Sequence, residues 1–505
     1  MISLVLFFPL LIALIISFLP NKFVRPFALG SAILEFIFSL HFLYHFDKSI
    51  AALQFVEKMA WIKSFGISYF VGIDGISIWL VVLSTFLVPI IILASWESIN
   101  TRVKSFHISL FVLLTAMLGS FVSMDAVLFY TFWELSLIPM YLMIGIWGGP
   151  KRIYASIKFF IFTMFGSVLM LLAIISMMLL AQEQLGGMTA NLLDLYKLNI
   201  PYVEGSMFGP VNPQTLMFFA FALAFAIKVP MFPVHTWLPD AHTEAPTAGS
   251  VILAGVMLKM GTYGFLRFAL PLFPTALAEW AWLFMFLGTV GIIYGALVAM
   301  VQPDIKRLVA YSSVSHMGYV VIGMFALNVY GVSGSIYQML NHGISTGALF
   351  ILVGMIYDRT HSRLIKDYGG LAKAMPLYTI AFVIITMSSI AVPGTNGFIG
   401  EYLILMGAFM SNKILGIFAV TGVVLGAAYM LWMVKKVFFG EEGPLVKDKN
   451  LKDINAREMS VMAVLIVMVF WMGVYPKFFL DYTKVSVDHL VKNVSSYSLE
   501  IKAGE

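Results

Sequence analysis

Six residues that can bind and release a proton lie inside long apolar stretches of this sequence: Glu134, Lys228, Lys259, His316, His342 and Glu401. Placing a charged side chain at the centre of a membrane helix costs roughly 2.5–3.5 kcal/mol on insertion scales, so such residues are usually kept for a function. A lysine and a carboxylate in a dry environment hold or release a proton as they approach or separate. The set predicts a proton relay. The structural alternative is a group of permanent salt bridges between helices.

The two histidines have small and hydroxylated neighbours. His316 lies in YSSVSHMGYV and His342 in QMLNHGISTG, on consecutive apolar segments. Paired histidines on adjacent helices could bind a b-type haem, but a lining of hydroxyl and amide groups suits ordered water better. Because histidine titrates near neutral pH and passes protons readily, we expect a hydrated wire here.

Two further charges in apolar segments have simpler explanations. Lys158 lies near the cytoplasmic end of its segment, where its long side chain can extend outward to water. Glu35 shares a segment with His41 and His45. For Glu35, a structural hydrogen bond to a neighbouring helix is as good an expectation as a role in transport.

The composition indicates a helical membrane protein. Of 505 residues, 60% are hydrophobic and 11% charged, and the mean hydropathy is +0.93. Soluble domains have about 45–50% apolar and about 25% charged residues. Apolar stretches of about 20 residues recur, each long enough to cross about 30 Å of hydrocarbon.

Absent motifs restrict the chemistry. The chain has no cysteine, which excludes disulfides, thiolate-bound iron–sulfur clusters and cysteine zinc sites. Neither a Gly-rich dinucleotide fingerprint nor a Walker-type phosphate loop occurs. We therefore expect no metal and no cofactor in this chain, no nucleic acid partner, and any redox cofactor in partner proteins.

Fourteen spans are predicted, as an all-α polytopic protein: 2–19, 27–46, 75–96, 106–124, 126–147, 153–181, 214–236, 246–270, 276–301, 307–328, 332–357, 376–411, 414–439 and 458–480. Residues 59–73 are expected to form a small surface hairpin. The first span has no basic n-region or cleavage site, so it is expected to be a retained helix. More than half of the 31 lysines and arginines fall in odd-numbered connections. By the positive-inside rule both termini lie on the outer, periplasmic side of a bacterial cytoplasmic membrane.

Two spans contain helix breakers. Pro230 and Pro233 follow Lys228 in span seven, and Pro393 and Gly394 precede Glu401 in span twelve. Proline removes a backbone hydrogen bond and frees the carbonyl four residues earlier. Such backbone is tolerated at membrane depth only against protein or internal water. The two spans run in opposite directions, as in inverted-repeat transporters. The break is therefore expected to bring water to Lys228.

Residues just beyond the first break are candidates for cytoplasmic access to the relay. His235, Asp240 and His242 lie there, followed by Glu244. An exposed acidic turn is the simpler alternative.

Four segments carry a family resemblance: FYTFWELSLIPMYLMIGIWGG, KVPMFPVHTWLPDAHTEAPTAGSVILAGVMLKMGTYGFLR, DIKRLVAYSSVSHMGYV and VPGTNGFIGEYLIL. They resemble the antiporter-like proton-channel subunits of respiratory NADH–quinone oxidoreductase, complex I. The resemblance implies two inverted five-helix repeats within residues 106–270 and 271–440. They are preceded by three helices in 1–105 and followed by helix 14 and a tail in 441–505.

The resemblance also implies roles and partners. Glu134 and Lys228 would form a coupling pair, Lys259 the central relay, His316 and His342 the connection, and Glu401 the exit-side group. FMN, iron–sulfur clusters and quinone would belong to partner subunits. The partners would be other complex I membrane subunits, including sibling antiporter-like ones, with lipid, protons and internal water.

Glu401 separates branches of this family, since siblings and their relatives in sodium/proton antiporters usually carry lysine there. Two alternatives remain open. One is a subunit of a multisubunit sodium/proton antiporter or a membrane-bound hydrogenase. The other is a structural scaffold whose buried charges are fixed salt bridges.

Overall fold

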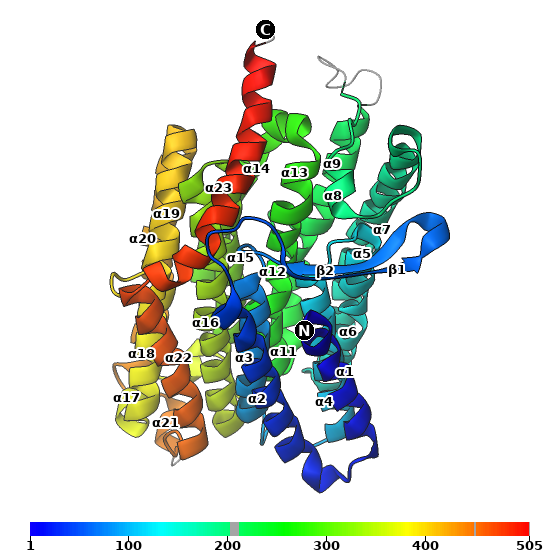
Figure 1. The fold of residues 1–505 in the computed structure, drawn as a ribbon. Helices are drawn as coiled ribbons and strands as arrows, with labels where there is room; N and C mark the ends of the chain where they lie inside the picture. The colour runs from blue at the N-terminus through cyan, green and yellow to red at the C-terminus, as the bar shows by residue number, and fades with distance from the viewer. Residues whose placement is uncertain (203–211, 449–450, 504–505) are drawn as a thin grey trace.

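The computed structural model describes residues 1–202, 212–448 and 451–503, which form a helical bundle with one β-hairpin (Figure 1). Within this part of the chain, ten segments are long and apolar enough to cross a membrane: α2 (Asn21–His45), α4 (Val103–Val122), α5 and α6 (Ala126–Leu135, Leu137–Trp147), α7 (Arg152–Leu185), α11 to α13 (Thr247–Leu272), α14 (Pro274–Met300), α15 (Ile305–Phe325), α16 (Val329–Thr360), α20 (Lys413–Phe438) and α22 (Ala456–Val474). Four shorter apolar helices are α1 (Ile2–Phe18), α3 (Ile78–Ala94), α9 (Pro213–Lys228) and α18 (Pro376–Ser389). These fourteen segments confirm the predicted all-α fold.

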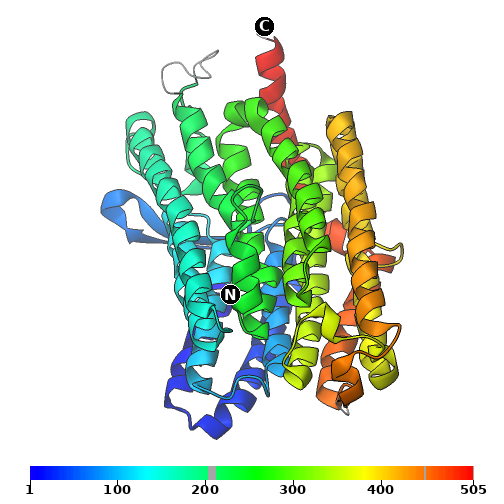
Figure 2. The same cartoon turned by 180° about the vertical axis from the view of Figure 1, so that it is seen from behind.

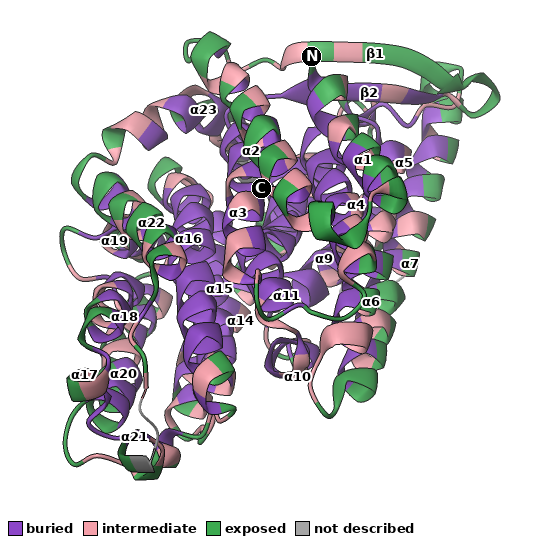
Figure 3. Cartoon of the chain, turned by 90° about the horizontal axis from the view of Figure 1, so that it is seen from below, coloured by how far each residue is buried: buried purple, intermediate pink, exposed green. Residues whose placement is uncertain are grey.

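Burial sorts the helices into a centre and a rim. The spans α11 to α13 and α16 are buried on all sides, whereas only 28% of the residues in the apolar windows of α2 and α20, and 33% in that of α22, are buried. Figure 3 shows α11, α15 and α16 mostly buried at the centre, with exposed residues on the outer helices. The exposed side chains there are largely apolar, such as Ile37 on α2 and Ile417 on α20. This is the pattern of a bundle whose outer surface faces hydrocarbon.

Both predicted helix breaks are present. Helix α9 ends at Lys228, and α10 (Trp237–Glu244) begins after an irregular turn. Helix α18 ends at Ser389, and α19 (Asn396–Ser411) begins after six intervening residues. The expectation of a bare carbonyl at Ala226 is wrong, because Met231 N–H donates to it at 2.7 Å. This local backbone hydrogen bond satisfies the Ala226 carbonyl without water.

Two further irregularities were not predicted. Ser136 separates α5 from α6, next to Glu134. The span Thr247–Leu272 contains two π-helical turns, η2 (Leu253–Met257) and η3 (Phe265–Ala269). Lys259 lies on α12 (Leu258–Gly264), between the two turns. Single π-turns inside α-helices are frequent at functional sites.

The predicted hairpin is confirmed as the antiparallel pair β1 (Gln54–Ile62) and β2 (Ile67–Ile73). Asp125 anchors it: one carboxylate oxygen accepts from Ser68 N–H at 2.8 Å, and the other caps α5. Residues 186–200, which include α8 (Leu192–Leu195), form backbone hydrogen bonds with the hairpin, and α13 (Leu270–Leu272) and the C-terminal helix border a cavity beside them at this end of the bundle. We call this end the hairpin face.

The expected C-terminal tail is instead helix α23 (Lys477–Ala503). It packs against α14 and α16. Its first turns are held by Trp79, whose indole N–H donates to the Phe479 carbonyl at 3.0 Å, and by Tyr482, whose hydroxyl donates to the Leu43 carbonyl at 3.0 Å. The remaining short helices, α17 (Leu371–Ala374) and α21 (Pro444–Asp448), lie at the opposite face.

The two halves of the bundle lie side by side. Figure 2 shows α7 at one side of the molecule and α20 at the other, with the middle of the chain between them. Helices α14 and α15 pack closely in that middle zone, and α16 packs against α19. The interrupted spans α9–α10 and α18–α19 therefore belong to different halves. The division into repeats at 106–270 and 271–440 stays a prediction.

Candidate functional site

Lys259 and His342 meet at the centre of the bundle. The Lys259 ammonium nitrogen lies 2.7 Å from His342 Nδ1, and it also donates to the carbonyl of Ala254 in the π-turn η2. Both side chains are buried. The π-turn leaves this carbonyl available to a side chain one turn later. The irregular backbone thus positions the lysine.

Two glycines let these helices approach. Gly343 on α16 faces Gly255 in η2, and a Cβ on Gly343 would lie 2.9 Å from the Gly255 carbonyl oxygen. Backbone therefore packs on backbone at this point. Because His342 immediately precedes Gly343, this close approach brings its ring to Lys259.

His342 continues toward His316 on α15. The two ring centroids are 6.0 Å apart. A cavity of about 10 Å³ lies between them, lined by polar groups that include Asn341, Ser345 and Ser389. That volume is near the minimum for a single water molecule, and the lining offers it several hydrogen-bond partners. It is far too small for a porphyrin.

Glu401 ends the row. Its Oε1 lies 3.2 Å from His316 Nδ1 and accepts from the Gln338 amide at 3.2 Å. The other nitrogen of His316 is 3.4 Å from the hydroxyl of Ser389, the last residue of α18. The break in this span thus forms one wall of the site. Lys259, His342, His316 and Glu401 form a buried row across α12, α16, α15 and α19, in which the small cavity borders the gap between the two histidine rings.

Lys228 lies apart from this row, at the end of α9. Its ammonium donates to the Ser136 hydroxyl at 3.0 Å and lies 4.6 Å from the Trp133 ring centroid. Among the described residues no ion pair within 4.0 Å joins Lys228 to Glu134, but the two charged groups are close enough to interact electrostatically. The two members of the pair implied by the family resemblance are therefore near each other without direct contact, and Ser136 holds the lysine.

Helix α12 comes close to the end of α9. A Cβ on Gly261 would lie 2.8 Å from the Phe225 carbonyl and 3.0 Å from Val229 N. This glycine contact places the helix of Lys259 directly beside the turn that follows Lys228. The described residues show no direct side-chain contact between the two lysines.

The expected access residues lie deeper than an exposed turn. Asp240 is half-buried and paired with Lys158 at 2.6 Å and with Arg307 at 3.8 Å. His235 is buried and stacks on Phe232. His242 is fully buried and stacks on Phe350, with ring centroids 4.6 Å apart. The alternative of an exposed acidic turn is wrong, because Asp240, His242 and Glu244 belong to helix α10 and none of the three is exposed.

Sequence reasoning missed Lys306, whose side chain is buried and donates to the Ala245 carbonyl. It acts electrostatically on the His242 ring, as does Lys259. A cavity of about 190 Å³ on the face opposite the hairpin is lined by Glu244, Lys306 and Asp358. The signal was present in Asp304, which caps the helix and places Lys306 in its first turn.

Two other expectations need correction. Lys158 does not extend freely into water, because it forms the ion pair with Asp240. Glu35 has no hydrogen-bond partner on either carboxylate oxygen among the described residues, so the expected bond to a neighbouring helix is not formed. Within the described chain, no group of three or more histidine, aspartate or glutamate side chains is arranged to hold a metal ion.

Interrupted helices in both halves and a buried lysine–histidine–glutamate row define the class: an antiporter-like transmembrane subunit. Comparisons with known proteins agree. The family described as NADH:quinone oxidoreductase/Mrp antiporter, TM, matches residues 123–426, and the family NADH-ubiquinone oxidoreductase chain 4, amino terminus, matches 1–124.

Relatives match over nearly the whole chain. NADH-quinone oxidoreductase subunit M of Rhodobacter capsulatus is 50% identical over 92% of this chain and 90% of its own length. NADH-ubiquinone oxidoreductase chain 4 of Marchantia polymorpha is 43% identical over 96% of each. The chain belongs to this family, in its subunit M or chain 4 branch. It is a membrane subunit of an oxidoreductase complex.

Solved structures show the same fold. A chain of respiratory complex I from Thermus thermophilus with bound NADH has a TM-score of 0.88 and 30% identity, covering 98% of this chain and all of its own. A chain of the Mrp complex from Dietzia sp. DQ12-45-1b has a TM-score of 0.79 at 19% identity, covering 99% of this chain and 56% of its own. That second likeness concerns the fold alone.

Proposed function

We propose that this chain carries protons across the membrane along the row Lys259, His342, His316 and Glu401. The work is driven by NADH oxidation and quinone reduction in partner subunits. The observation that carries the proposal is the row itself: four titratable side chains from four helices in buried succession. A permanent salt bridge would need one cation and one anion, whereas two imidazole rings between a lysine and a glutamate can each accept a proton on one ring nitrogen and release one from the other.

Protons reach the row from the face opposite the hairpin. The cavity lined by Glu244, Lys306 and Asp358 opens there. The positive charges of both Lys306 and Lys259 act on the His242 ring, which links the cavity to the row. Both ring nitrogens of His242 lack a partner among the described residues. A buried imidazole with two free nitrogens can pass a proton through intervening water. His235 and Asp240 border this route, and Asp240 serves mainly to hold Lys158.

Lys228 and Glu134 control the row. Their separation across Ser136 is one of two arrangements, and the other brings the ammonium onto the carboxylate. Closing the Lys228–Glu134 pair changes the electric field at Lys259, because the helix of Lys259 packs beside the end of α9 at Gly261. The changed field alters the proton affinity of the row. The breaks at Pro230, Pro233, Pro393 and Gly394 allow such movement without breaking a continuous helix.

The energy comes from outside this chain. Moving one charge against 100 mV costs about 2.3 kcal/mol. We assign FMN, iron–sulfur clusters and quinone to the other subunits of the complex. The chain lies in the bacterial cytoplasmic membrane beside sibling antiporter-like subunits, with lipid around it and water inside it. Its hairpin face and both termini lie on the outer, periplasmic side.

Lys228→Ala and Glu134→Ala test the controlling pair. In the assembled complex, each should reduce proton pumping and NADH–quinone turnover together, because transfer and chemistry are coupled. Pumping is measured as acidification in proteoliposomes, and turnover as NADH oxidation. Lys197→Ala is the matched control, since this lysine is exposed and pairs only with Asp194.

Normal pumping by either variant would contradict the assignment. Replacing both residues together, as Lys228→Met with Glu134→Leu, separates a relay from a scaffold. A scaffold with a fixed salt bridge keeps pumping after this neutral exchange. Proton pumping that requires added sodium would favour a sodium/proton antiporter.

A further inference from the structure

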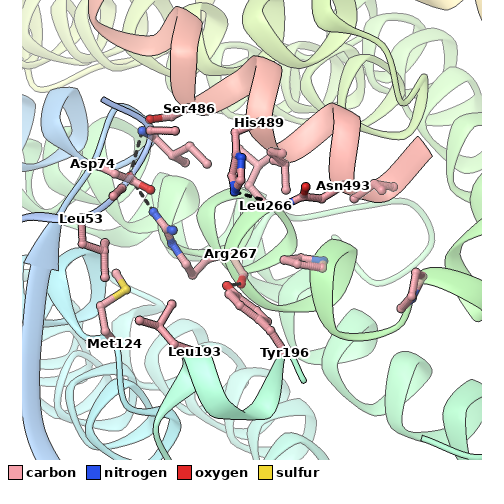
Figure 4. Close-up of a pocket in the computed structure, with 17 residues that line it drawn as sticks. Leu53, Asp74, Met124, Leu193, Tyr196, Leu266, Arg267, Ser486, His489 and Asn493 are labelled. Carbon is pink, nitrogen blue, oxygen red and sulfur yellow. Dashed lines mark hydrogen bonds and ion pairs between the residues drawn. The ribbon is translucent and has the colours of Figure 1, made fainter. Parts of the chain in front are cut away.

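A cavity of about 640 Å³ lies at the hairpin face, outside the relay. Its rim includes the exposed residues Ala52, His489 and Asn493, and its floor is formed by the buried pair Asp74 and Arg267 (Figure 4). Water thus has a wide approach from this face down to one ion pair.

Arg267 is held in place from several sides. Its Nη2 lies 2.6 Å from Asp74 Oδ1, and its Nε donates to the Tyr263 hydroxyl at 3.1 Å. Its carbonyl accepts from the Tyr196 hydroxyl at 2.6 Å. Figure 4 shows the guanidinium pointing from its helix toward Asp74, with Tyr196 at its base.

Asp74 is equally constrained. The same Oδ1 accepts from Ile76 N–H at 3.0 Å and Ser77 N–H at 3.2 Å, at the start of α3. Helix α23 clamps the loop, because Ser486 Oγ accepts from Gly75 N–H at 3.0 Å. A Cβ on Gly75 would meet Ser486, so only glycine permits this approach.

The relay begins just below this floor. Arg267 and Lys259 lie on the same span, eight residues and so about 12 Å apart. Tyr263 lies midway, four residues from each and therefore on the same face. Its hydroxyl donates to the Phe121 carbonyl at 2.9 Å, so the hydroxyl proton is held in a hydrogen bond inside the protein. Water in the cavity is thus two helical turns from the central lysine.

We propose that the Arg267–Asp74 pair, with Tyr263 beneath it, is a seal that closes the relay against the hairpin face. Arginine does not lose its proton in a protein, and the Asp74 carboxylate is already paired with it, so the ion pair at the end of the cavity offers no group that passes a proton inward. Asp74 holds the guanidinium there. A proton on Lys259 is therefore directed sideways, through His342 and His316 to Glu401, and does not leave through the first half of the molecule. The inference rests on the relay proposed above.

The test removes both charges together. Arg267→Met with Asp74→Asn leaves no uncompensated buried charge, and the asparagine oxygen can still accept from Ile76 and Ser77. In proteoliposomes containing the assembled complex, an imposed pH gradient should decay several-fold faster than with the parent. NADH oxidation should continue while net acidification falls.

Two controls isolate the seal. Lys477→Met with Asp481→Asn removes an exposed ion pair from α23 and should leave the decay unchanged. Arg267→Lys keeps the positive charge and should also stay sealed. Unchanged decay in the Arg267→Met/Asp74→Asn variant would overturn the proposal. A loss of acidification without faster decay would also overturn it, since that result would mean that Tyr263 and the ion pair themselves conduct protons.

A second measurement leaves the ion pair intact. The chain has no cysteine, so single cysteines report access to a membrane-impermeant thiol reagent added at the hairpin face. Asn493→Cys at the rim should react, and Thr262→Cys below the seal should not. Equal labelling of the two would overturn the seal. Failure of the relay itself would appear differently, as normal pumping by a Lys259 variant without faster decay.

Discussion

At the scale of the residue, the row is set by which atoms each side chain can reach. Glu401 accepts from His316 and from Gln338 through a single oxygen. The Lys259 ammonium donates to the Ala254 carbonyl and also lies within hydrogen-bond distance of His342 Nδ1. Among the described residues Lys259 has no carboxylate within ion-pair distance, and Glu401 faces a histidine that can itself release its proton. The capacity to exchange a proton, and not charge alone, distinguishes the row from a structural salt bridge.

Glu401→Gln tests this capacity. Glutamine keeps an oxygen that can accept from His316 and Gln338, so the complex should assemble. It cannot titrate, so proton pumping should be lost and coupled NADH oxidation should slow. Acidification and NADH oxidation are measured in the same proteoliposomes, with Glu183→Gln, an exposed glutamate on α7, as control. Pumping at the parent rate would mean that protons leave by another group.

At the scale of the element, the interruptions bring the charges together. The break between α18 and α19 places Ser389 and Glu401 on opposite sides of His316. The π-turn η2 presents the Ala254 carbonyl to Lys259. Close glycine contacts fix these irregular segments against their neighbours. A regular helix in either place would point the same side chains elsewhere.

Gly397→Ala tests the second break. A Cβ there would collide with the Ser388 carbonyl oxygen and force α18 and α19 apart. Overpacking of this kind costs about 1–3 kcal/mol. We expect lower thermal stability of the complex and reduced pumping. Gly426→Ala on α20 is the matched control, because a Cβ there meets nothing within 4 Å. Equal effects of the two substitutions would show that the break is not tightly packed.

Sequence reasoning recovered the features that depend on local composition. Apolar length predicted the spans, proline predicted both breaks, and charges in apolar segments predicted the members of the row. Features that depend on neighbours escaped it. The π-turn at Leu253–Met257 depends on α16 packing against Gly255, and the burial of Lys306 depends on helices distant in the sequence.

Helix α23 could have been predicted from the sequence. Helix α23 buries Phe479, Tyr482, Ser486 and Leu490, at helical spacing. This periodicity was readable in the sequence, although the mixture of polar residues suggested a tail.

At the scale of the whole molecule, the bundle separates two aqueous approaches. The cavity with Lys306 opens at one face, and Lys306 acts electrostatically on the buried His242 ring. The cavity above Arg267 opens at the hairpin face and ends at an ion pair. Between them the buried row runs laterally from one half of the molecule to the other. A protein that moves protons without leaking them needs both an approach and a seal.

The most direct test of this account is proton translocation by the assembled complex carrying Lys259→Met, which keeps the length of the side chain and removes its proton. We predict that acidification and NADH oxidation fall together, since a rise of about 1.4 kcal/mol in the transfer barrier already slows turnover tenfold. The passive decay of an imposed gradient should stay at the parent rate. Acidification at the parent rate, in a complex shown to contain the variant chain, would contradict the account.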